Sequence, residues 1–236
     1  MIKILGVKID NTTKYQAMQK IASFLKSEKQ HYIVTPNPEF LVAANKDKEF
    51  KKVLNKADLS LPDGVGLVFA SLFKIKERIT GTDLIEDICK HAEKHCYTIY
   101  LLGGEKDIAH LSSCKLQKKC KRLKIAGYQD GMTSESTNLD HINVAQPDIL
   151  FVAFGHIKQE KWIKENLHSL PSVKIAIGIG GAFDYISGRV NRAPVIMRGL
   201  GLEWMYRLAK QPKRAKRIYD AVIKFPILVI IDKIKQ

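Results

Sequence analysis

The chain lacks the long apolar runs and the leader-like start of proteins that enter or cross membranes. Its longest apolar run covers residues 225–231, well short of the roughly 18 residues that a membrane-spanning helix needs. Its first residues do not contain the apolar stretch of a secretory signal peptide. We therefore expect a cytoplasmic protein, either free in solution or bound peripherally to a membrane.

Cysteine is scarce, and the short motifs of several nucleotide and metal sites are missing. The four cysteines form no C-x-x-C pair and match no zinc spacing, so we expect no bound metal. Reduced thiols fit the cytoplasm. The absence of a Walker A motif argues against ATP hydrolysis. No D-x-D pair is present to hold a metal-bound diphosphate, so a diphosphate ligand would need arginines to balance its charge.

Acidic residues are in short supply, which leaves a net charge of +15. Residues 189–236 carry twelve Lys or Arg against three Asp or Glu, which is more than half of the surplus. Such a segment binds nucleic acid, forms a solvated helix face or docks on anionic lipid. Trp204, Tyr206 and Phe225 lie among its cations, which favours a membrane surface. Nucleic-acid binding would instead require stacking aromatics along a sheet or groove, a pattern that we do not see.

Apolar segments of strand length alternate with helical patterns along most of the chain. Strands are expected at residues 2–9, 31–35, 59–61, 98–102, 124–128, 149–154 and 173–177. Helices are expected at residues 12–26, 39–45, 50–57, 83–95, 107–119 and 159–167. Asn11 or Thr12 is expected to cap the first helix, and Thr82 or Asp83 the fourth. This alternation predicts an α/β fold with a mostly parallel sheet covered by helices on both faces.

Residues 1–193 are expected to form this core, and residues 194–236 a basic, amphipathic helical appendage. Four polar or glycine-rich segments each follow an expected strand, at residues 35–39, 62–66, 155–160 and 178–184. Ligands of parallel α/β folds bind beyond the carboxyl ends of the strands. We therefore expect these four segments to line one crevice.

Two of these segments carry side chains suited to acid–base chemistry or to substrate binding. Asp63, before Gly64, either stabilises a turn through its own backbone or acts as a general base on a sugar hydroxyl. Residues 35–39 form either a proline-rigidified turn before a helix or a site that presents the Thr35 hydroxyl and the Asn37 amide. Spacing alone does not separate these interpretations.

Two further segments offer contacts to a nucleotide or a sugar. Residues 78–83 lead into a helix, which either begins with an ordinary cap or holds a phosphate or hydroxyl through backbone amides and Thr82. Residues 178–184 approach the dinucleotide fingerprint G-x-G-x-x-G but lack its last glycine. The candidate substrate-binding residues of these two segments are Arg78, Thr82, Asp83, Gly180, Gly181 and Asp184.

Two other classes of protein share some of these features. The glycine turn and the alternating pattern fit a NAD- or nucleotide-dependent oxidoreductase, which would need an acidic ribose-binding residue about 20 residues further on. The stretch at residues 198–203 looks helical instead. Net charge alone suggests a basic nucleic-acid-binding protein.

Motifs in a fixed order across nearly the whole chain resemble one known family. They are residues 35–39 (TPNPE), 62–66 (PDGVG), 78–83 (RITGTD), 101–104 (LLGG), 147–148 (PD) with 158–160 (KQE), 180–184 (GGAFD), 188–194 (GRVNRAP) and 202–208 (LEWMYRL), followed by Pro212 and Arg214. Each motif is a weak signal by itself, whereas their order is specific. The chain resembles the WecG/TagA/CpsF family of bacterial glycosyltransferases.

This resemblance implies a Rossmann-like fold and an inverting, metal-independent sugar transfer without a cofactor. Similar family members transfer N-acetylmannosamine or its uronic acid from a UDP donor to N-acetylglucosamine on a polyprenyl diphosphate. Their products enter wall teichoic acid, enterobacterial common antigen or capsule. The expected partners are a UDP-amino-sugar, a polyprenyl-linked acceptor and the anionic inner face of the bacterial plasma membrane, and not nucleic acid. Apolar faces near the appendage also leave a homo-oligomer open.

The resemblance also implies roles for individual residues. Asp63 matches the family's catalytic base, Thr35 its active-site threonine and Gln159 a polar motif position. The arginines that match the family's membrane-docking appendage, which helps to complete the site, are Arg207, Arg214 and Arg217. The family usually has a proline two residues before the Gln-Glu pair, where this chain has Ile157 after His156.

Overall fold

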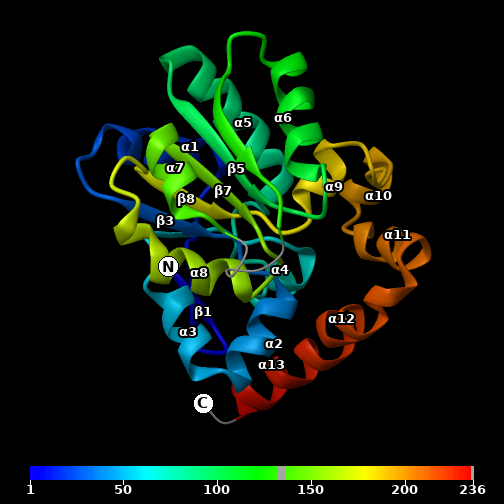
Figure 1. Ribbon diagram of the computed structural model, residues 1–236. Helices are drawn as coiled ribbons and strands as arrows, with labels where there is room; N and C mark the ends of the chain where they lie inside the picture. Colours follow the sequence, from blue (N-terminus) through cyan, green and yellow to red (C-terminus); the bar gives the residue numbers. More distant parts are fainter. Residues whose placement is uncertain (132–136, 235–236) are drawn as a thin grey trace.

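A computed structural model of the chain describes residues 1–131 and 137–234 (Figure 1). Within these residues, the centre is a six-stranded parallel sheet. From edge to edge its strands are β4 (Leu59–Ser60), β3 (His31–Val34), β8 (Ile175–Gly178), β7 (Ile149–Ala153), β5 (Thr98–Gly103) and β6 (Lys124–Gln129). The central strand β7 is buried along its whole length. The prediction of a Rossmann-like α/β fold is confirmed.

Helices pack on both faces of the sheet. One face carries α2 (Pro38–Lys46), α3 (Lys48–Asn55), α7 (Leu139–Ala145) and α8 (Lys158–Asn166). The other carries α1 (Lys14–Lys26), α5 (Gly81–His95), α6 (Ile108–Lys119) and α9 (Ala182–Ile186). Successive side chains of a strand point to opposite faces, so Leu102 joins one apolar core and Leu101 the other. With both faces covered, the carboxyl ends of the strands are where polar segments can gather.

The N-terminal segment differs from the single strand expected at residues 2–9. It forms a hairpin of β1 (Ile2–Ile4) and β2 (Val7–Ile9), which pair antiparallel and stand apart from the main sheet. Leu5 and Gly6 turn the chain in the left-handed backbone region, with φ of 50° and 76°. Leucine is an unusual residue for such a turn, so the sequence pattern gave no strong hairpin signal.

Two expected helix caps are wrong by one to three residues. α1 is capped by Thr13, whose hydroxyl accepts the N–H of Gln16, rather than by either of the two residues before it. α5 is capped by Thr80, whose hydroxyl accepts the N–H of Asp83, rather than by Thr82 or Asp83. In both places several residues with capping side chains stand close together, and local sequence does not choose among them.

Within the described residues, three short helices were not predicted. They are α4 (Val65–Ala70), α7 and α9, of six, seven and five residues. Helices of one or two turns are too short for an apolar period of 3.6 residues to show. α4 and α9 matter for function because each begins within one of the polar segments at the strand ends, at residues 62–66 and 178–184.

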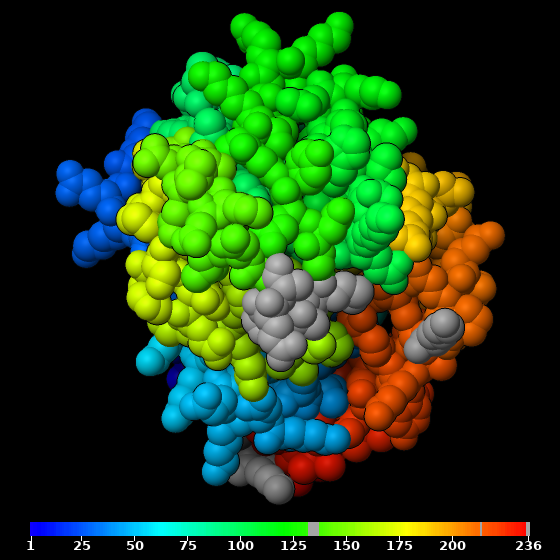
Figure 2. All heavy atoms as spheres, viewed as in Figure 1, coloured from blue at the N-terminus to red at the C-terminus, as the bar shows by residue number. Residues whose placement is uncertain are grey.

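After Ala193 the chain continues as short helices, coloured orange to red in Figure 1. They are α10 (Val195–Gly199), α11 (Glu203–Lys210), α12 (Ala215–Tyr219) and α13 (Phe225–Ile234), with a 3₁₀ turn at Pro212–Arg214 and a π-helical turn at Asp220–Lys224. We call residues 194–234 the C-terminal segment. Figure 2 shows it lying along one side of the core. A domain boundary at residue 193 stays a prediction.

α13 packs against α2 and α4 and buries Phe225 and Val229. Pro226 is the second residue after the π-helical turn, which ends at Lys224. Because proline lacks a backbone N–H and clashes with the preceding turn of a regular α-helix, a wider turn accommodates it. Among the helices of the described residues, none is both long enough and apolar enough to cross a membrane.

Candidate active site

A cavity of about 260 Å³ lies over the carboxyl ends of the parallel strands. Residues that follow β3, β4, β5, β7 and β8 line it, together with arginines of the C-terminal segment. We call it the polar cavity, and its walls include Thr35, Asp63, Gly104, His156, Gln159, Gly180, Gly181, Asp184, Arg207, Arg214 and Arg217. The four segments that the sequence placed after separate strands therefore meet in one crevice.

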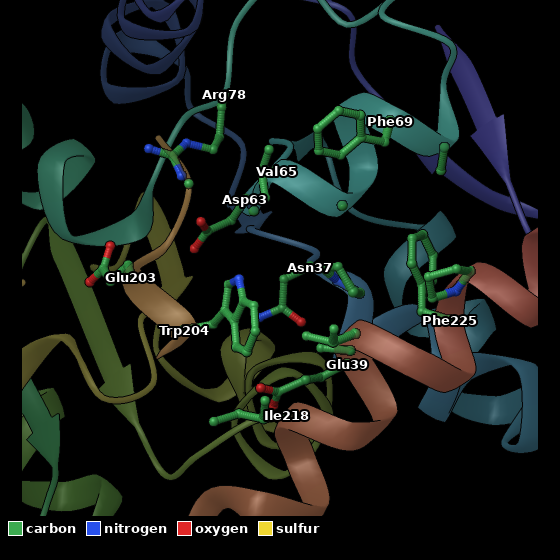
Figure 3. Close-up of a pocket in the computed structure, with 18 of the residues that line it drawn as sticks. Asn37, Glu39, Asp63, Val65, Phe69, Arg78, Glu203, Trp204, Ile218 and Phe225 are labelled. Carbon is green, nitrogen blue, oxygen red and sulfur yellow. The ribbon is translucent and has the colours of Figure 1, made fainter. Parts of the chain in front are cut away.

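A second cavity, of about 540 Å³, lies between α4 and the helices of the C-terminal segment (Figure 3). We call it the apolar cavity, and its walls include Pro38, Val65, Gly66, Phe69, Trp204, Ile218, Val222, Phe225, Val229 and Ile230. Charged groups from Arg78, Glu203 and Lys233 also line it. Figure 3 shows the Asp63 carboxylate directed into this cavity, with Glu203 and Trp204 among the residues around it.

The two cavities share part of their walls. The residues that line both are Asn37, Asp63, Thr82, Arg207 and Arg214. A carboxylate and two guanidinium groups therefore stand where a polar compartment meets an apolar one. In the part of the chain that the structure describes, no three His, Cys, Asp or Glu side chains are grouped so as to hold a metal ion.

Asp63 is fixed by a turn at the end of β4. Its N–H donates to the carbonyl of Pro36 at 2.9 Å, which ties the turn to the segment after β3. Gly64 has φ of 98°, a conformation that glycine adopts without steric cost, and it redirects the chain into α4. One carboxylate oxygen lies 3.5 Å from the amide nitrogen of Gly81, which is a weak contact. Asp63 is thus both a turn residue and a carboxylate on the cavity wall.

Burial raises the pKa of the Asp63 carboxyl from an ordinary 3.8 to about 6. The positive charge of Arg207 lowers this pKa, and the negative charge of Glu203 raises it. A carboxylate with this pKa is still mostly ionised at neutral pH, and it is a stronger base than an ordinary aspartate. It is therefore suited to take a proton from a hydroxyl group.

Thr35 and Asn37 follow β3. Thr35 is buried and lines the polar cavity. The amide oxygen of Asn37 accepts the N–H of Phe40 at 3.0 Å and caps α2, whose first residue is Pro38. This confirms the proline-rigidified helix start, and it leaves the amide NH₂ of Asn37 as the donor available to a ligand.

Gln159 connects α8 to the glycine turn after β8. Its amide oxygen accepts the N–H of Gly180 at 2.9 Å, and its NH₂ donates to Glu160 at 2.6 Å. Glu160 is fully buried, and burial raises the pKa of its carboxyl to about 7. A Cβ on Gly178 would lie 2.5 Å from the Glu160 carboxylate and 2.7 Å from the amide nitrogen of Gln159, so a larger residue would displace this pair. Glu160 therefore orients Gln159, which in turn holds the glycine turn.

Ile157 occupies the place where the resemblance led us to expect proline. It has φ of 73°, which a proline ring cannot adopt, and its N–H donates to Glu160 at 2.8 Å, a bond that proline cannot make. The loop before α8 therefore has a backbone that a proline at this position would forbid. The same loop still presents Gln159 to the polar cavity.

Three arginines of the C-terminal segment form a cationic wall. Arg207 lies over the ring of Tyr185, 4.7 Å from its centroid, and donates to its hydroxyl. Arg217 pairs with Glu39 of α2 at 2.7 Å. Burial and the charges of Arg207 and Arg217 lower the pKa of Arg214. Clustered cations of this kind bind an anion strongly, because an anion relieves their mutual repulsion.

Gly181 lies between the cationic wall and Asp184. A Cβ at this position would lie 3.3 Å from a carboxylate oxygen of Asp184 and 3.4 Å from a guanidinium nitrogen of Arg214. Burial raises the pKa of Asp184, and the charge of Arg214 lowers it. The backbone at Gly181 can therefore approach a ligand closely, with one acidic and one basic group at hand.

Asp83 has a different place from the one we expected. It lies in the walls of neither cavity, and its two carboxylate oxygens accept hydrogen bonds from Arg192 at 2.6 and 3.1 Å. Burial raises the pKa of Asp83, but the hydrogen bonds from Arg192 and Thr80 outweigh burial and lower it to about 2. Asp83 therefore holds Arg192, which lines the apolar cavity, and its assignment to substrate binding is not supported by this geometry.

Arg78 and Thr82 do line cavities, as expected. Arg78 lies in the wall of the apolar cavity and donates to the carbonyl of Arg198 at 2.7 Å, which joins the core to the C-terminal segment. Residues of the site that the sequence did not single out are Glu39, Glu160, Arg192, Glu203 and Trp204. All five fall within quoted motifs, but burial and long-range pairing, which give them their roles, leave no mark in the local sequence.

A model of the glycosyl transferase WecG/TagA/CpsF family matches residues 2–236. The chain belongs to this family. It is therefore a glycosyltransferase, and the oxidoreductase and nucleic-acid-binding alternatives are set aside.

Curated relatives are similar along most of their length. The N-acetylglucosaminyldiphosphoundecaprenol N-acetyl-beta-D-mannosaminyltransferase of Bacillus subtilis (strain 168) is 37% identical over 225 residues, which cover 90% of this chain and 87% of the relative. The protein of the same name from Bacillus spizizenii is 34% identical over 200 residues, 83% of this chain and 77% of the relative. That of Staphylococcus aureus (strain MRSA252) is 32% identical over 245 residues, 100% of this chain and 95% of the relative.

Proposed function

We propose that this glycosyltransferase moves N-acetylmannosamine from UDP to N-acetylglucosamine on a polyprenyl diphosphate, in cell-surface polysaccharide synthesis of the wall teichoic acid type. The observation that carries the proposal is the position of Asp63 at the junction of a polar and an apolar cavity. A water-soluble donor and a lipid-linked acceptor need such a pair of compartments with a base between them. The names of the three relatives support this sugar and this acceptor.

The donor's place in this proposal is the polar cavity. The glycine turn at Gly180 and Gly181 lets the backbone approach a diphosphate closely, and Arg214 and Arg217 supply positive charge beside it. Thr35 supplies a hydroxyl for the sugar or nucleotide. These contacts need no metal ion, since arginines can balance the diphosphate charge, and we propose a transfer without metal or cofactor.

The acceptor's place is the apolar cavity. Its diphosphate lies toward Arg207, which lines both cavities, and the first isoprene units lie along the apolar walls from α4 and α13. Burial of hydrocarbon against Phe69, Phe225 and Ile230 gives this end of the acceptor its affinity. The sugar of the acceptor then reaches Asp63 from one side while the donor sugar reaches it from the other.

The transfer is an inverting displacement. Asp63 takes the proton of the acceptor hydroxyl as that oxygen attacks the anomeric carbon from the face opposite UDP. The bond between the anomeric carbon and the UDP oxygen breaks, and UDP leaves with the electron pair. Arg214 and Arg217, which lie beside the donor diphosphate, stabilise the negative charge that develops on it as UDP departs.

We also propose that the enzyme works at the cytoplasmic face of the plasma membrane, docked through its basic C-terminal segment. Residues 189–236 carry a surplus of nine positive charges, and α13 exposes Ile227, Ile230, Ile231 and Ile234. Lysine and arginine beside exposed apolar side chains favour the surface of an anionic bilayer. The acceptor's lipid anchor then stays in the bilayer while its head group enters the site.

An assay of UDP release tests this function directly. A panel of UDP-sugars is offered with a short-chain lipid-linked N-acetylglucosamine acceptor, with and without EDTA. We expect release that needs the acceptor, that is fastest with UDP-N-acetylmannosamine and that EDTA leaves unchanged. Asp63→Ala should lose rate by at least about 100-fold while still binding UDP.

Three results would contradict the proposal in different parts. Preference for another UDP-sugar would reject the donor, and loss of activity in EDTA that added metal restores would reject the metal-free mechanism. An unchanged rate in Asp63→Ala would remove Asp63 from the base role. UDP binding by the variant, measured by calorimetry, is the control that its site is still formed.

A further inference from the structure

The end of α4 and the turn that follows it expose apolar side chains on the core itself. Phe69, Leu72 and Phe73 are 56%, 64% and 70% exposed. The rings of Phe69 and Phe73 meet edge to face with centroids 5.2 Å apart. Single exposed apolar residues are common on proteins, but three together in one turn mark a contact surface. We call residues 69–73 the apolar turn.

The apolar turn is built in an unusual backbone conformation. Leu72 and Phe73 have φ of 54° and 60°, in the left-handed region that bulky side chains rarely adopt. The buried Ser71 holds this shape, because its hydroxyl donates to the carbonyl of Val68 at 2.7 Å and accepts the N–H of Ile75 at 3.2 Å. The two exposed side chains are therefore displayed by an anchored, strained turn, and such strain tends to persist where function needs it.

The apolar turn borders the apolar cavity. Phe69 lines that cavity, and Ile230 and Lys233 of α13 line it from the other side. α4 and α13 pack against each other. Figure 3 shows Phe69 and Phe225 reaching the cavity from these two helices. The exposed isoleucines of α13 and the apolar turn therefore flank one and the same cavity.

Lysines lie beside both the apolar turn and the exposed isoleucines of α13. Lys74 and Lys76 follow the apolar turn directly and are exposed, and Lys233 is exposed near the end of α13. Apolar tips with lysines beside them suit the boundary between anionic head groups and acyl chains, where the tips are buried and the lysines meet phosphate. A second copy of this chain, with its net charge of +15, would instead bring like charges together at this surface.

We propose that the apolar turn inserts into the surface of an anionic bilayer together with α13. Core and C-terminal segment then straddle the entrance through which a polyprenyl chain passes from the bilayer into the apolar cavity. This inference rests on the proposed function for the identity of the acceptor, whereas bilayer insertion itself is testable without any substrate.

The decisive variant is Leu72→Asn/Phe73→Asn. Asparagine tolerates left-handed backbone, so this change removes the apolar side chains and keeps the turn. Neither residue lines a cavity. The matched control is Val144→Asn on α7, which removes an isolated apolar side chain that is 85% exposed. Sedimentation with phosphatidylglycerol-containing vesicles should show binding at least about tenfold weaker in the double variant, and unchanged in the control.

Two activity measurements separate this inference from the proposed function. Transfer to acceptor embedded in vesicles should fall in the double variant, and transfer to a short-chain, water-soluble acceptor should stay at the wild-type level. A wild-type protein that binds vesicles but transfers to neither acceptor rejects the proposed function and leaves insertion standing. Vesicle binding by the double variant equal to wild type overturns the inference.

A second variant keeps the inference testable if the double variant folds poorly, as its melting temperature would show. In Phe73→Trp, the added tryptophan should shift its emission to shorter wavelength when vesicles are added, beyond any change in the wild-type protein. Absence of that shift overturns the inference. The inference is also overturned if the wild-type protein is a dimer, the double variant is a monomer and the two bind vesicles equally. The apolar turn would then join copies of the chain.

Discussion

The pH dependence of transfer should follow the ionisation of Asp63 and should respond in opposite directions to its two charged neighbours. Arg207 lowers the pKa of this carboxyl and Glu203 raises it. Replacing Arg207 by Gln should therefore move the pKa of Asp63 upward, and replacing Glu203 by Gln should move it downward. The two substitutions put the same uncharged side chain on the same helix, α11, so each serves as the control for the other.

The size of the effect follows from the raised pKa. With a pKa of about 6, Asp63 is about 97% ionised at pH 7.5 and about 9% ionised at pH 5, so the rate should fall about tenfold between them. An aspartate with the ordinary pKa of 3.8 would lose less than about 10% of its ionised form over the same interval. The acid limb of the profile therefore distinguishes the buried carboxylate from a solvent-exposed one.

The assay is the initial rate of UDP release against pH, at saturating acceptor and over a range of donor concentrations. The acid limb in kcat/KM for the donor reports the enzyme before the donor binds, with the acceptor already in place. Arg207→Gln is also expected to lose rate at every pH, because we propose that Arg207 positions the acceptor's diphosphate. The test is therefore the pH at which the acid limb falls, and not the maximal rate of the profile.

A profile that stays flat down to pH 5 in the wild-type enzyme would refute the assignment of a raised pKa to the catalytic base. Limbs that move in the same direction in both variants would show that a group other than Asp63 titrates. A limb that persists in Asp63→Asn, measured on its residual activity, would point to the same conclusion.

Three further outcomes are expected. Asp63→Asn should raise the free energy of unfolding by at most about 3 kcal/mol above pH 6 and by little below pH 4. The reason is that an aspartate whose pKa is raised in the folded protein destabilises the fold only at a pH where the same aspartate is ionised in the unfolded chain. Chemical denaturation at both pH values measures this difference. The upper limit assumes full burial, and the partial exposure of Asp63 to the cavities reduces the gain. Glu160→Gln should raise the KM for the donor about 2- to 10-fold in steady-state kinetics. The Glu160 carboxylate accepts one hydrogen bond from the side chain of Gln159 and one from the N–H of Ile157, and the substitution removes one of the two. An unchanged KM would mean that Glu160 does not position the donor site. Ile157→Pro should lower the melting temperature more than Ile157→Gly, because glycine adopts φ of 73° and keeps the N–H; equal losses would contradict the backbone assigned here.

The sheet and its crevice could be predicted because their signals are local. Residues 149–153 are an apolar run of strand length, and Asp63 and Gly180 each stand directly after a strand. Once the strands are parallel, their carboxyl ends share one edge, so residues that are far apart in the sequence must meet. Local pattern plus one topological rule was enough to place Asp63 in the same cavity as the glycine turn.

The pairing of charged side chains could not be predicted in this way. Asp83 and Arg192 are 109 residues apart, and Glu39 and Arg217 are 178 apart. A local motif does not indicate which distant residue pairs with it. The sequence therefore led us to expect that Asp83 binds substrate, and not that it pairs with Arg192. The apolar turn was missed for a related reason, since Leu72 and Phe73 adopt backbone conformations that their side chains give no reason to expect.

Apolar contact, more than ion pairing, holds the C-terminal segment against the core. Phe225 is 1% exposed against α2 and α4, and burying such a side chain stabilises a fold by about 2 to 3 kcal/mol. The pair between Arg217 and Glu39, whose side chains are 35% and 19% exposed, contributes about 1 kcal/mol or less. The ion pair therefore decides where the guanidinium lies, while α13 decides whether the segment is in place. Because α12, the π-helical turn and α13 follow one another without a break, Arg214 and Arg217 can line the polar cavity only while Phe225 stays packed.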